Sequence, residues 1–282
     1  MEIIETIDGM RKAIAKAKST GKKIGLVPTM GALHAGHISL VKAAKKETDF
    51  AVVSIFVNPT QFGPTEDIDK YPRPFEADRK ACKDSGVDIV FAPTVKEMYP
   101  QQNITWVNVE KLSEPLCGKT RPIHFRGVAT VCTKLFNIVQ PDIAFFGQKD
   151  AQQTVVIKQM VADLNMPLKI VVCPTVREKD GLAMSSRNKY LNAEQRKDAP
   201  LLYAALQEAE VFIGAGERKS SFLKEQMKKL LSISSRTEID YISIADAKTL
   251  EEIDEIKGKI LIAMAVKLGP ARLIDNIVLD VE

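Results

Sequence analysis

The sequence predicts an α/β fold, a doubly wound parallel sheet followed by a smaller C-terminal α+β domain. Strands that alternate with helices are typical of such sheets, and both kinds of segment can be followed along the first part of the chain. Short apolar runs bounded by turn residues predict strands that are buried on both faces. These runs are IGLV at 24–27, AVVSIFV at 51–57, VDIVFA at 87–92, DIAFFG at 142–147 and LKIVVC at 168–173.

Helical periods separate these strands, and the clearest one precedes the fourth strand. Its apolar residues recur at three-and-four spacing, which places them on one helical face: Val128, Val131, Cys132, Leu135, Phe136 and Val139. After about residue 176 a polar segment leads to two charged amphipathic helices, at 194–213 and 218–232, and to strands near 238–245 and 258–267. We therefore expect two domains, 1–175 and 176–282, with the boundary near Thr175.

The composition indicates an ordinary globular protein that favours small anions over nucleic acid. Hydrophobic residues make up 45% and charged residues 27% of the 282 residues, as in typical folded domains. The 40 Lys and Arg exceed the 36 Asp and Glu by a net charge of +4, and the charges are interspersed. Aromatic residues, at 6%, offer few platforms for base stacking. A nucleic-acid-binding module is thus the alternative with less support, and small anionic ligands suit the mild basic excess.

The cysteines and the N-terminus favour a cytoplasmic protein. Cys82, Cys117, Cys132 and Cys173 form no C-x-x-C pair and lie in aliphatic segments, so neither a disulfide framework nor a zinc cluster is indicated. The first residues lack the apolar core of a signal peptide, and the longest apolar run, ILIAMAV at 260–266, is too short to span a bilayer. We expect reduced, buried thiols and no membrane partner.

The stretch VPTMGALHAGH at 27–37 holds two of the three histidines. It connects a predicted strand to a helix, so it lies at the carboxyl edge of the sheet, where open α/β sheets bind ligands. Gly31 and Gly36 let the backbone approach a ligand, and the helix N-terminus that follows suits phosphate. A spacing of three places His34 and His37 on one side of the first turn. Both imidazoles would then donate hydrogen bonds to phosphate oxygens as charge develops in a displacement at phosphorus.

Three other interpretations of this pair stay open: a metal pair, a helix cap and chance. A metal site needs a further ligand, and His124 stands in a segment without Cys or clustered carboxylates. Two segments look like other known nucleotide-binding loops, but neither has the residues that such a loop requires. The histidine loop lacks G-x-G-x-x-G spacing, and SEPLCGKT at 113–120 has Ser113 where a phosphate loop has its first glycine.

Polar side chains also follow two other predicted strands. FVNPTQFGP at 56–64 offers the amides of Asn58 and Gln61, which suit hydroxyl and carboxylate groups of a substrate, although Asn58 alone also fits a simple turn. FFGQKDAQQ at 145–153 offers a turn glycine, a cation, an acceptor or helix cap, and another amide: Gly147, Lys149, Asp150 and Gln153.

Two loops add hydroxyls and cations. AMSSRNKYL at 183–191 holds groups suited to triphosphate oxygens, and it would close over a nucleotide. An exposed linker is the alternative for this segment. RPIHFRG at 121–127 adds cations for an anion or a partner, and a solvated surface turn is the alternative for Arg126. The residues concerned are Ser185, Ser186, Arg187, Arg121, His124 and Arg126.

Taken together, VPTMGALHAGH, FVNPTQFGP, FFGQKDAQQ and AMSSRN resemble the pantothenate synthetase family of AMP-forming pantoate–β-alanine ligases, in order and over essentially the whole chain. The H-x-G-H element alone is similar to the wider nucleotidyltransferase superfamily, and MSSR looks like the second signature of class I aminoacyl-tRNA synthetases. The resemblance implies a Rossmann-like fold with a smaller C-terminal lid, and a homodimer. It implies that ATP and pantoate form an enzyme-bound pantoyl adenylate and pyrophosphate, and that the β-alanine amine then gives pantothenate and AMP.

The resemblance also implies roles for single residues. The catalytic residues would be His34, Lys149 and His37, with His37 as proton donor. Gln61, Gln153, Asn58 and Arg121 would bind the other substrates, with Gln61 also at the β-alanine end. The residues implied to bind ATP are Met30, Gly31, Ala32, Leu33, His34, Ala35, Gly36, His37, Gly147, Gln148, Lys149, Asp150, Val176, Met184, Ser185, Ser186 and Arg187.

ATP in turn implies Mg²⁺, held largely by phosphate oxygens and water with help from Asp78. The leading alternative among enzymes is a nucleotidylyltransferase that retains the nucleotide on its product. The two reactions differ in the fate of AMP.

Overall fold

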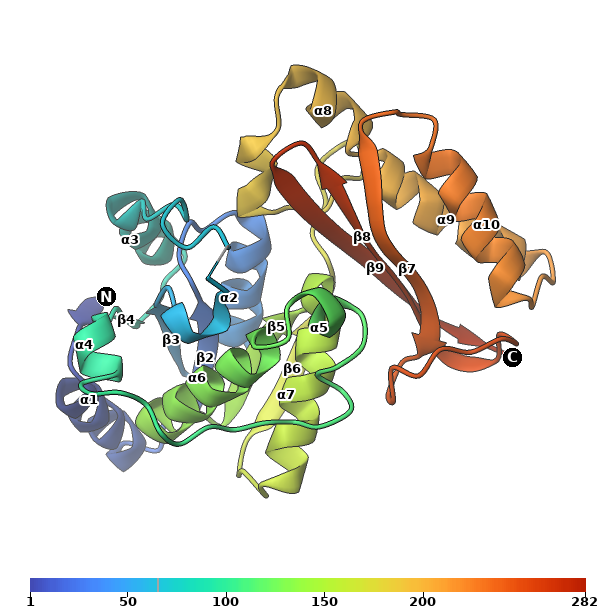
Figure 1. Ribbon diagram of the computed structural model, residues 1–282. Coiled ribbons are helices and arrows are strands. Elements are labelled where there is room, and N and C mark those ends of the chain that lie inside the picture. Colours follow the sequence, from blue (N-terminus) through green and yellow to red (C-terminus); the bar gives the residue numbers. More distant parts are fainter. Residues whose placement is uncertain (65) are drawn as a thin grey trace.

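The computed structural model describes residues 1–64 and 66–282, and two sheets form within that part of the chain (Figure 1). The strands of the first are β1 (Glu2–Ile4), β2 (Ile24–Thr29), β3 (Phe50–Ile55), β4 (Ile89–Phe91), β5 (Ile143–Gly147) and β6 (Lys169–Cys173). They are parallel and lie in the order β1-β4-β3-β2-β5-β6. All five strands predicted from the apolar runs are present, so the α/β prediction is confirmed.

The direction of winding reverses between β2 and β5. From β2 the chain moves outward through β3 to β4, and from β5 it moves the other way to β6. Gly25 and Leu26 of β2 pair with Ile143 and Ala144 of β5. The loops that leave the carboxyl ends of these two strands diverge, and this switch point is where doubly wound folds bind ligands. The histidine loop and the 147–150 loop are the two loops concerned.

Helices cover both faces of this sheet: α1 (Ile7–Ser19), α2 (Ala35–Glu47), α3 (Phe75–Asp84), α4 (Val95–Met98), α5 (Cys117–Thr120), α6 (His124–Val139) and α7 (Ala151–Asp163). Apolar side chains of α1, α6 and α7 share one core cluster with the sheet, and those of α2 and α3 share another. In the described parts of the chain, we find no helix whose length and hydrophobicity would let it cross a bilayer. The predicted apolar face of α6 is buried throughout: Val128, Val131, Cys132, Leu135, Phe136 and Val139.

The second sheet is antiparallel and has a core of its own. It consists of β7 (Thr237–Asp246), β8 (Gly258–Leu268) and β9 (Ala271–Val281), in that order. Figure 1 shows α9 (Leu201–Gly214) and α10 (Ser220–Leu231) along one side of it, after the short α8 (Ala193–Asp198). Leu206, Met227 and Met264 belong to one buried cluster that joins these helices to the sheet. Leu250, Leu261 and Ala263 of the C-terminal part belong instead to the first core cluster, and the division between residues 175 and 176 stays a prediction.

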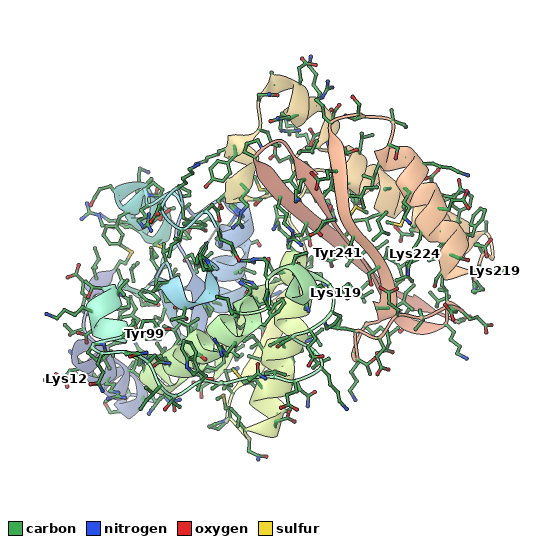
Figure 2. The ribbon with its side chains drawn as sticks, viewed as in Figure 1. Lys12, Tyr99, Lys119, Lys219, Lys224 and Tyr241 are labelled. Atoms are coloured by element: carbon green, nitrogen blue, oxygen red, sulfur yellow. The ribbon has the colours of Figure 1, made fainter. Side chains whose placement is uncertain are left out.

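The two parts of the chain meet near α5. The Tyr241 hydroxyl on β7 lies 3.3 Å from Cys117 Sγ, and Arg272 Nη1 on β9 lies 3.5 Å from the same sulfur. Figure 2 shows Tyr241 on the side of the antiparallel sheet that faces the first domain. The antiparallel sheet therefore contacts the domain that carries the histidine loop.

Two elements of the C-terminal part differ from the sequence prediction. The helix expected over 194–213 is two helices, α8 and α9. Pro200 separates them, because proline lacks a backbone N–H and its ring clashes with the carbonyl one turn earlier. Strand β9 is not predicted. Its buried positions include Asp275 and Asn276, 2% and 4% exposed, so the segment lacks the apolar alternation that marks a strand.

The contact between α6 and the 3₁₀ turn η1 (Pro59–Gln61) gives a test of the packing. A Cβ atom at Gly127 would lie 2.4 Å from the Thr60 carbonyl oxygen and 2.6 Å from Gln61 Cα. We predict that Gly127→Ala lowers the free energy of unfolding by on the order of 2 kcal/mol, because overpacking outweighs the better helix propensity of alanine. Gly214→Ala in α9, where the added Cβ meets open space, is the matched control. Denaturant unfolding measures both, and equal stability of the two variants would contradict the packing.

Candidate active site

The histidine loop runs from β2 into the first turn of α2, and its two rings cap that helix. His34 Nδ1 accepts a hydrogen bond from the Gly36 N–H at 3.1 Å, and His37 Nδ1 accepts one from the His34 N–H at 3.3 Å. The ring centroids lie 4.1 Å apart. The helix-cap interpretation is therefore correct, and the caps hold both rings together as the spacing predicts.

The capping bonds determine which ring nitrogen carries the hydrogen. A neutral imidazole has one donor and one acceptor. Because each Nδ1 accepts a backbone hydrogen bond, each Nε2 is the donor. Desolvation, assisted by the Lys149 cation, lowers the pKa of His34 to about 4. Desolvation, assisted by His34, lowers the pKa of His37 to about 3. Both rings are thus neutral hydrogen-bond donors at pH 7.

A buried carboxylate on α3 holds the backbone of the same loop. Asp78 is 2% exposed; its Oδ2 accepts from the Ala32 N–H at 2.8 Å and its Oδ1 from the Leu33 N–H at 2.7 Å. These bonds stabilise two left-handed residues, Gly31 with φ 82° and Ala32 with φ 51°. Both oxygens are used inside the protein. We therefore assign Asp78 to holding the loop, and its expected help in binding Mg²⁺ stays a prediction.

The amides of Asn58 and Gln61 have different tasks. Asn58 is 1% exposed, and its Oδ1 accepts from the Tyr99 hydroxyl at 2.9 Å. Its Nδ2 donates to Gln61 Oε1 at 3.1 Å and to the Gly127 carbonyl at 3.2 Å. Asn58 therefore positions Gln61, and its expected contact with substrate stays a prediction. Gln61 Nε2 lies 3.1 Å from Met30 Sδ, against the histidine loop.

The 147–150 loop leaves β5 and is held by the C-terminal part of the chain. Asn276 on β9 donates to the carbonyls of Gln148 and Lys149, at 3.0 and 2.9 Å, and accepts from the Gln148 amide at 2.9 Å. Beside it, Asp275 pairs with Arg177 at 2.6 Å. Sequence reasoning missed Asn276 because it missed β9. The signal that could reveal it is a polar side chain at an inner strand position, since buried polar groups need partners.

The 176–187 segment forms another wall of the site. The Met184 N–H donates to the Val176 carbonyl at 3.0 Å. Ser185 caps the 3₁₀ turn η3 (Ser186–Tyr190) by accepting from the Arg187 N–H at 3.2 Å. The segment is thus an ordered turn, and the exposed-linker alternative is wrong.

The third histidine has the opposite tautomer. His124 Nδ1 donates to the Gln61 carbonyl at 3.0 Å, which leaves Nε2 as an acceptor. Burial, assisted by the charge of Arg121, lowers the pKa of His124 to about 4. His124 is therefore neutral at pH 7, and the expectation that it serves as a cation is wrong. Arg126 lies over the Trp106 ring at 4.7 Å, which fits the surface alternative.

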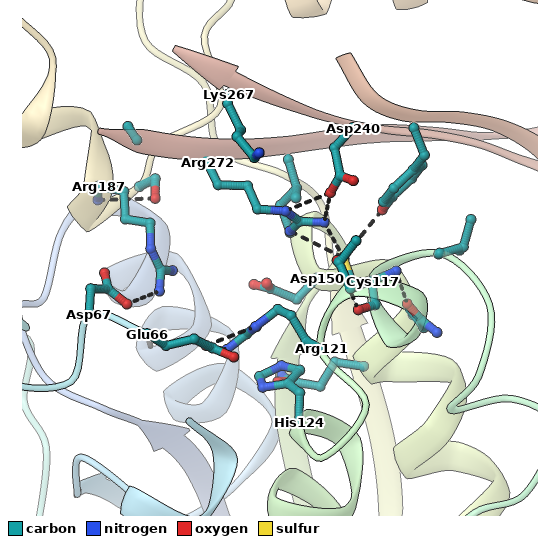
Figure 3. Close-up of a pocket in the computed structure, with 18 of the residues that line it drawn as sticks. Glu66, Asp67, Cys117, Arg121, His124, Asp150, Arg187, Asp240, Lys267 and Arg272 are labelled. Atoms are coloured by element: carbon teal, nitrogen blue, oxygen red, sulfur yellow. Dashed lines mark hydrogen bonds and ion pairs between the residues drawn. The ribbon is translucent and has the colours of Figure 1, made fainter. Parts of the chain in front are cut away.

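These elements enclose two adjoining cavities, of about 230 and about 1110 Å³. Figure 3 shows part of the larger one, which extends from the first domain to the antiparallel sheet. Residues that line both are Arg121, His124, Lys149, Asp150, Gln153, Ser185 and Arg187. The smaller cavity brings together most of the predicted site: Met30, His34, Gly36, His37, Asn58, Gln61, Arg121, Gly147, Lys149, Asp150, Gln153, Val176, Met184, Ser185, Ser186 and Arg187.

Some predicted ATP-binding residues contribute in another way. Within the described part of the chain, five of these residues line neither of the two cavities: Gly31, Ala32, Leu33, Ala35 and Gln148. The first four shape the backbone of the histidine loop, and Gln148 is held by β9.

The two other candidate motifs are accounted for. SEPLCGKT is no phosphate loop: Gln152 accepts from the Cys117 N–H at 3.0 Å and donates to the carbonyls of Leu112 and Pro115 at 3.0 and 2.7 Å. Its backbone is therefore held from within the protein. Across residues 1–64 and 66–282, no group of three His, Cys, Asp or Glu side chains is placed to hold a metal ion. The metal-pair interpretation of the histidines has no support in this geometry.

A doubly wound sheet with paired histidine donors at its switch point, and cations around the adjoining cleft, defines an α/β enzyme of the nucleotidyl-transfer class. The comparison with family models specifies it further. The chain belongs to the pantoate-beta-alanine ligase family, whose model matches residues 2–278.

Relatives support this assignment over the full length of the chain. Pantothenate synthetases from Acetivibrio thermocellus and Moorella thermoacetica are each 55% identical, over 281 and 282 residues, with 100% of both chains covered. The crystal structure of pantothenate synthetase from Thermus thermophilus matches with a TM-score of 0.94 and 44% identity, over 98% of this chain and 99% of that one. Pantoate-beta-alanine ligase from Francisella tularensis, complexed with beta-gamma ATP and beta-alanine, matches with a TM-score of 0.81 and 36% identity, over 98% and 97%. The resemblance that the four motifs indicate is confirmed.

The lowered histidine pKa values predict a loss of stability in acid. His34, His37 and His124, at about 4, 3 and 4, stay neutral in the folded protein, whereas the unfolded chain binds protons below about pH 6.5. The contribution of these neutral histidines to the free energy of unfolding is full above that pH and falls as the pH drops toward 4. At pH 5 the loss is on the order of 1 kcal/mol per histidine, after allowance for partial solvent exposure. Urea unfolding at a series of pH values measures it, and His124→Gln is expected to flatten the slope. If the free energy of unfolding of the variant changed with pH as steeply as that of the wild type, the assignment of His124 as a buried, neutral group would be contradicted.

Proposed function

We propose that this chain uses ATP to condense pantoate with β-alanine through an enzyme-bound pantoyl adenylate, with release of pyrophosphate and AMP. The observation that carries the proposal is the pair of neutral imidazoles at the N-terminus of α2, whose Nδ1 atoms are engaged by the backbone and whose rings line the cavity. The family assignment and the Francisella tularensis complex with beta-gamma ATP and beta-alanine support it.

In the first step a pantoate carboxylate oxygen attacks the α-phosphorus of ATP, the bond from that phosphorus to the bridging oxygen breaks, and pyrophosphate leaves. Negative charge builds up on the phosphate oxygens. His34 and His37 donate Nε2–H hydrogen bonds to these oxygens, and Lys149 adds a positive charge. Donors that are already fixed need no reorganisation when the charge develops. Because its Nδ1 accepts the His34 N–H, His37 meets the triphosphate as a neutral imidazole, and its role as donor is the Nε2–H hydrogen bond.

The nucleotide lies between the histidine loop, the 147–150 loop and the 176–187 segment. ATP contacts the residues of the histidine loop that line the cavity, which are Met30, His34, Gly36 and His37. Gly147, Lys149 and Asp150 hold the ribose and phosphates, and Val176 contacts adenine. Residues 184–187 bind the phosphates, with Arg187 as the main cation. This arrangement uses the two loops at the switch point of the sheet.

Gln61 and Gln153 bind pantoate, because their amides can donate to the carboxylate and accept from the hydroxyls. Arg121 lies at the junction of the two cavities. In the second step the β-alanine amine attacks the acyl carbon, the bond between that carbon and the AMP oxygen breaks, and the nitrogen loses a proton. The adenylate held beside the amine gives this step a large proximity advantage.

Magnesium enters with the triphosphate, as part of the substrate. Both oxygens of Asp78 accept backbone hydrogen bonds, and the described residues contain no three-ligand cluster for a metal. A cage of protein ligands therefore does not fit this site. Mg²⁺ that keeps several waters and binds phosphate oxygens does fit, because it needs few protein ligands.

We further propose a cytoplasmic homodimer. Cys82, Cys117, Cys132 and Cys173 are free, buried thiols, which fits a reducing compartment. The homodimer rests on the resemblance to the family. Light scattering of the purified protein is expected to give twice the chain mass of 31.2 kDa; the mass of a single chain at micromolar concentration would refute it.

Substitutions at His37 separate its capping bond from its Nε2 donor. His37→Asn keeps an acceptor near the Nδ1 position but loses the outer donor, whereas His37→Gln places an amide nitrogen near Nε2. We predict that His37→Asn lowers pantoate-dependent exchange of labelled pyrophosphate into ATP by roughly a hundredfold or more, as removal of a transition-state donor does. His37→Gln is expected to retain more activity than His37→Asn.

The assay omits β-alanine, so it reports formation of the adenylate alone. Thermal melting of both variants is the control, and a collapse of melting in both would make the histidine structural. Folded wild-type protein that shows no exchange with pantoate and Mg²⁺ would count against the ligase, and it would favour a nucleotidylyltransferase that keeps the nucleotide on its product.

A further inference from the structure

Two arginines of the cleft are paired with carboxylates from one short loop. Arg121 Nε donates to Glu66 Oε2 at 3.0 Å, and Arg187 Nη2 donates to Asp67 Oδ1 at 3.2 Å. Glu66 and Asp67 are neighbours in the chain, whereas Arg121 precedes α6 and Arg187 belongs to η3. Figure 3 shows both pairs in the larger cavity, and all four residues line it.

Both pairs are partly withdrawn from water. The side chains of Arg121 and Glu66 are 18% and 21% exposed, and those of Arg187 and Asp67 are 28% and 29% exposed. Burial works against ionisation of Glu66, but the hydrogen bond and charge of Arg121 outweigh it and hold the pKa of this carboxyl below its usual value. Glu66 is therefore an anion at neutral pH, and solvent screens the two pairs less than it screens pairs on the open surface.

We infer that Glu66 and Asp67 are internal anions that neutralise Arg121 and Arg187 until a polyphosphate enters the cleft, and that they thereby set the affinity of the site for ATP. The inference rests on the proposed function, in which Arg187 grips the triphosphate. A phosphate that takes over Arg187 has to break the pair with Asp67, so the free energy of that pair is subtracted from the free energy of binding. A ligand without phosphates makes no such exchange.

The loop has other supports that do not involve these carboxylates. The Arg73 guanidinium donates to the carbonyls of Ile68 and Tyr71, at 3.0 and 3.1 Å. The Tyr190 hydroxyl donates to the Lys70 carbonyl at 3.4 Å, which joins the loop to η3. Neutral variants of Glu66 and Asp67 are therefore expected to keep the loop in place.

Calorimetric titration of the full-length protein with ATP and Mg²⁺, without pantoate, tests the inference. Glu66→Gln and Asp67→Asn remove the charges and nearly preserve the shapes. We expect the Kd for ATP to fall roughly three- to tenfold in each variant. Adenosine, which has no phosphate, is expected to bind the variants and the wild type equally. Asp67→Glu keeps the charge, and we expect it to keep the wild-type affinity for ATP.

Two control variants each remove the acidic partner of an exposed ion pair within a helix, outside the lining of both cavities. Glu76→Gln removes the partner of Arg79, and Asp8→Asn removes the partner of Lys12. Neither is expected to change ATP binding. Melting curves verify folding, and if one cleft variant fails to fold, the other pair still tests the inference. Unchanged or weaker ATP binding in folded Glu66→Gln and Asp67→Asn would overturn the inference. Wild-type protein that binds no ATP would instead overturn the proposed function.

Discussion

The two hydrogen bonds that Asp78 accepts from the backbone of Ala32 and Leu33 are the constraint on which the site depends. They hold the loop after β2 in a left-handed bend, and that bend starts α2 at His34. Only from this start do the two imidazoles cap the helix, and the caps leave each Nε2–H as the free donor. One buried carboxylate thus positions both imidazoles of the histidine loop.

The site combines neutral hydrogen-bond donors with arginines that are paired with carboxylates. Desolvation keeps His34 and His37 neutral beside Lys149. Arg121 and Arg187 carry full charges, but carboxylates accompany both. In the proposed reaction, neutral donors favour the state in which charge grows on the phosphate oxygens more than they favour bound ATP, and such differential binding accelerates a reaction. Partly compensated arginines act in the same direction, because they moderate the attraction for ATP before it reacts.

The C-terminal part of the chain shapes the nucleotide site as well as covering it. Asn276 holds the backbone of the 147–150 loop, and Asp275 holds Arg177 next to Val176. Tyr241 and Cys117 join the antiparallel sheet to α5. Because the contacts of Asn276 and Tyr241 join the antiparallel sheet to the first part of the chain, a movement of that sheet would alter the loop that carries Lys149. The geometry of the site is therefore coupled to the placement of the C-terminal sheet.

Local sequence patterns were sufficient for strands β2 to β6 of the parallel sheet, for the buried face of α6 and for the edge at which the loops gather. The physical reason is that strands buried on both faces need continuous apolar runs, and the carboxyl ends of parallel strands share one edge. Patterns failed for β1, which has only three residues, and for β9, whose buried Asp275 and Asn276 interrupt the apolar alternation.

The roles of single polar groups required the folded chain. Asp78 meets a backbone 46 residues away, and burial and Arg121 hold His124 neutral. The Asn58 amide is engaged by Tyr99, Gln61 and Gly127. Whether a polar side chain is exposed, buried or paired depends on distances between segments remote in the chain, and no local spacing encodes those distances.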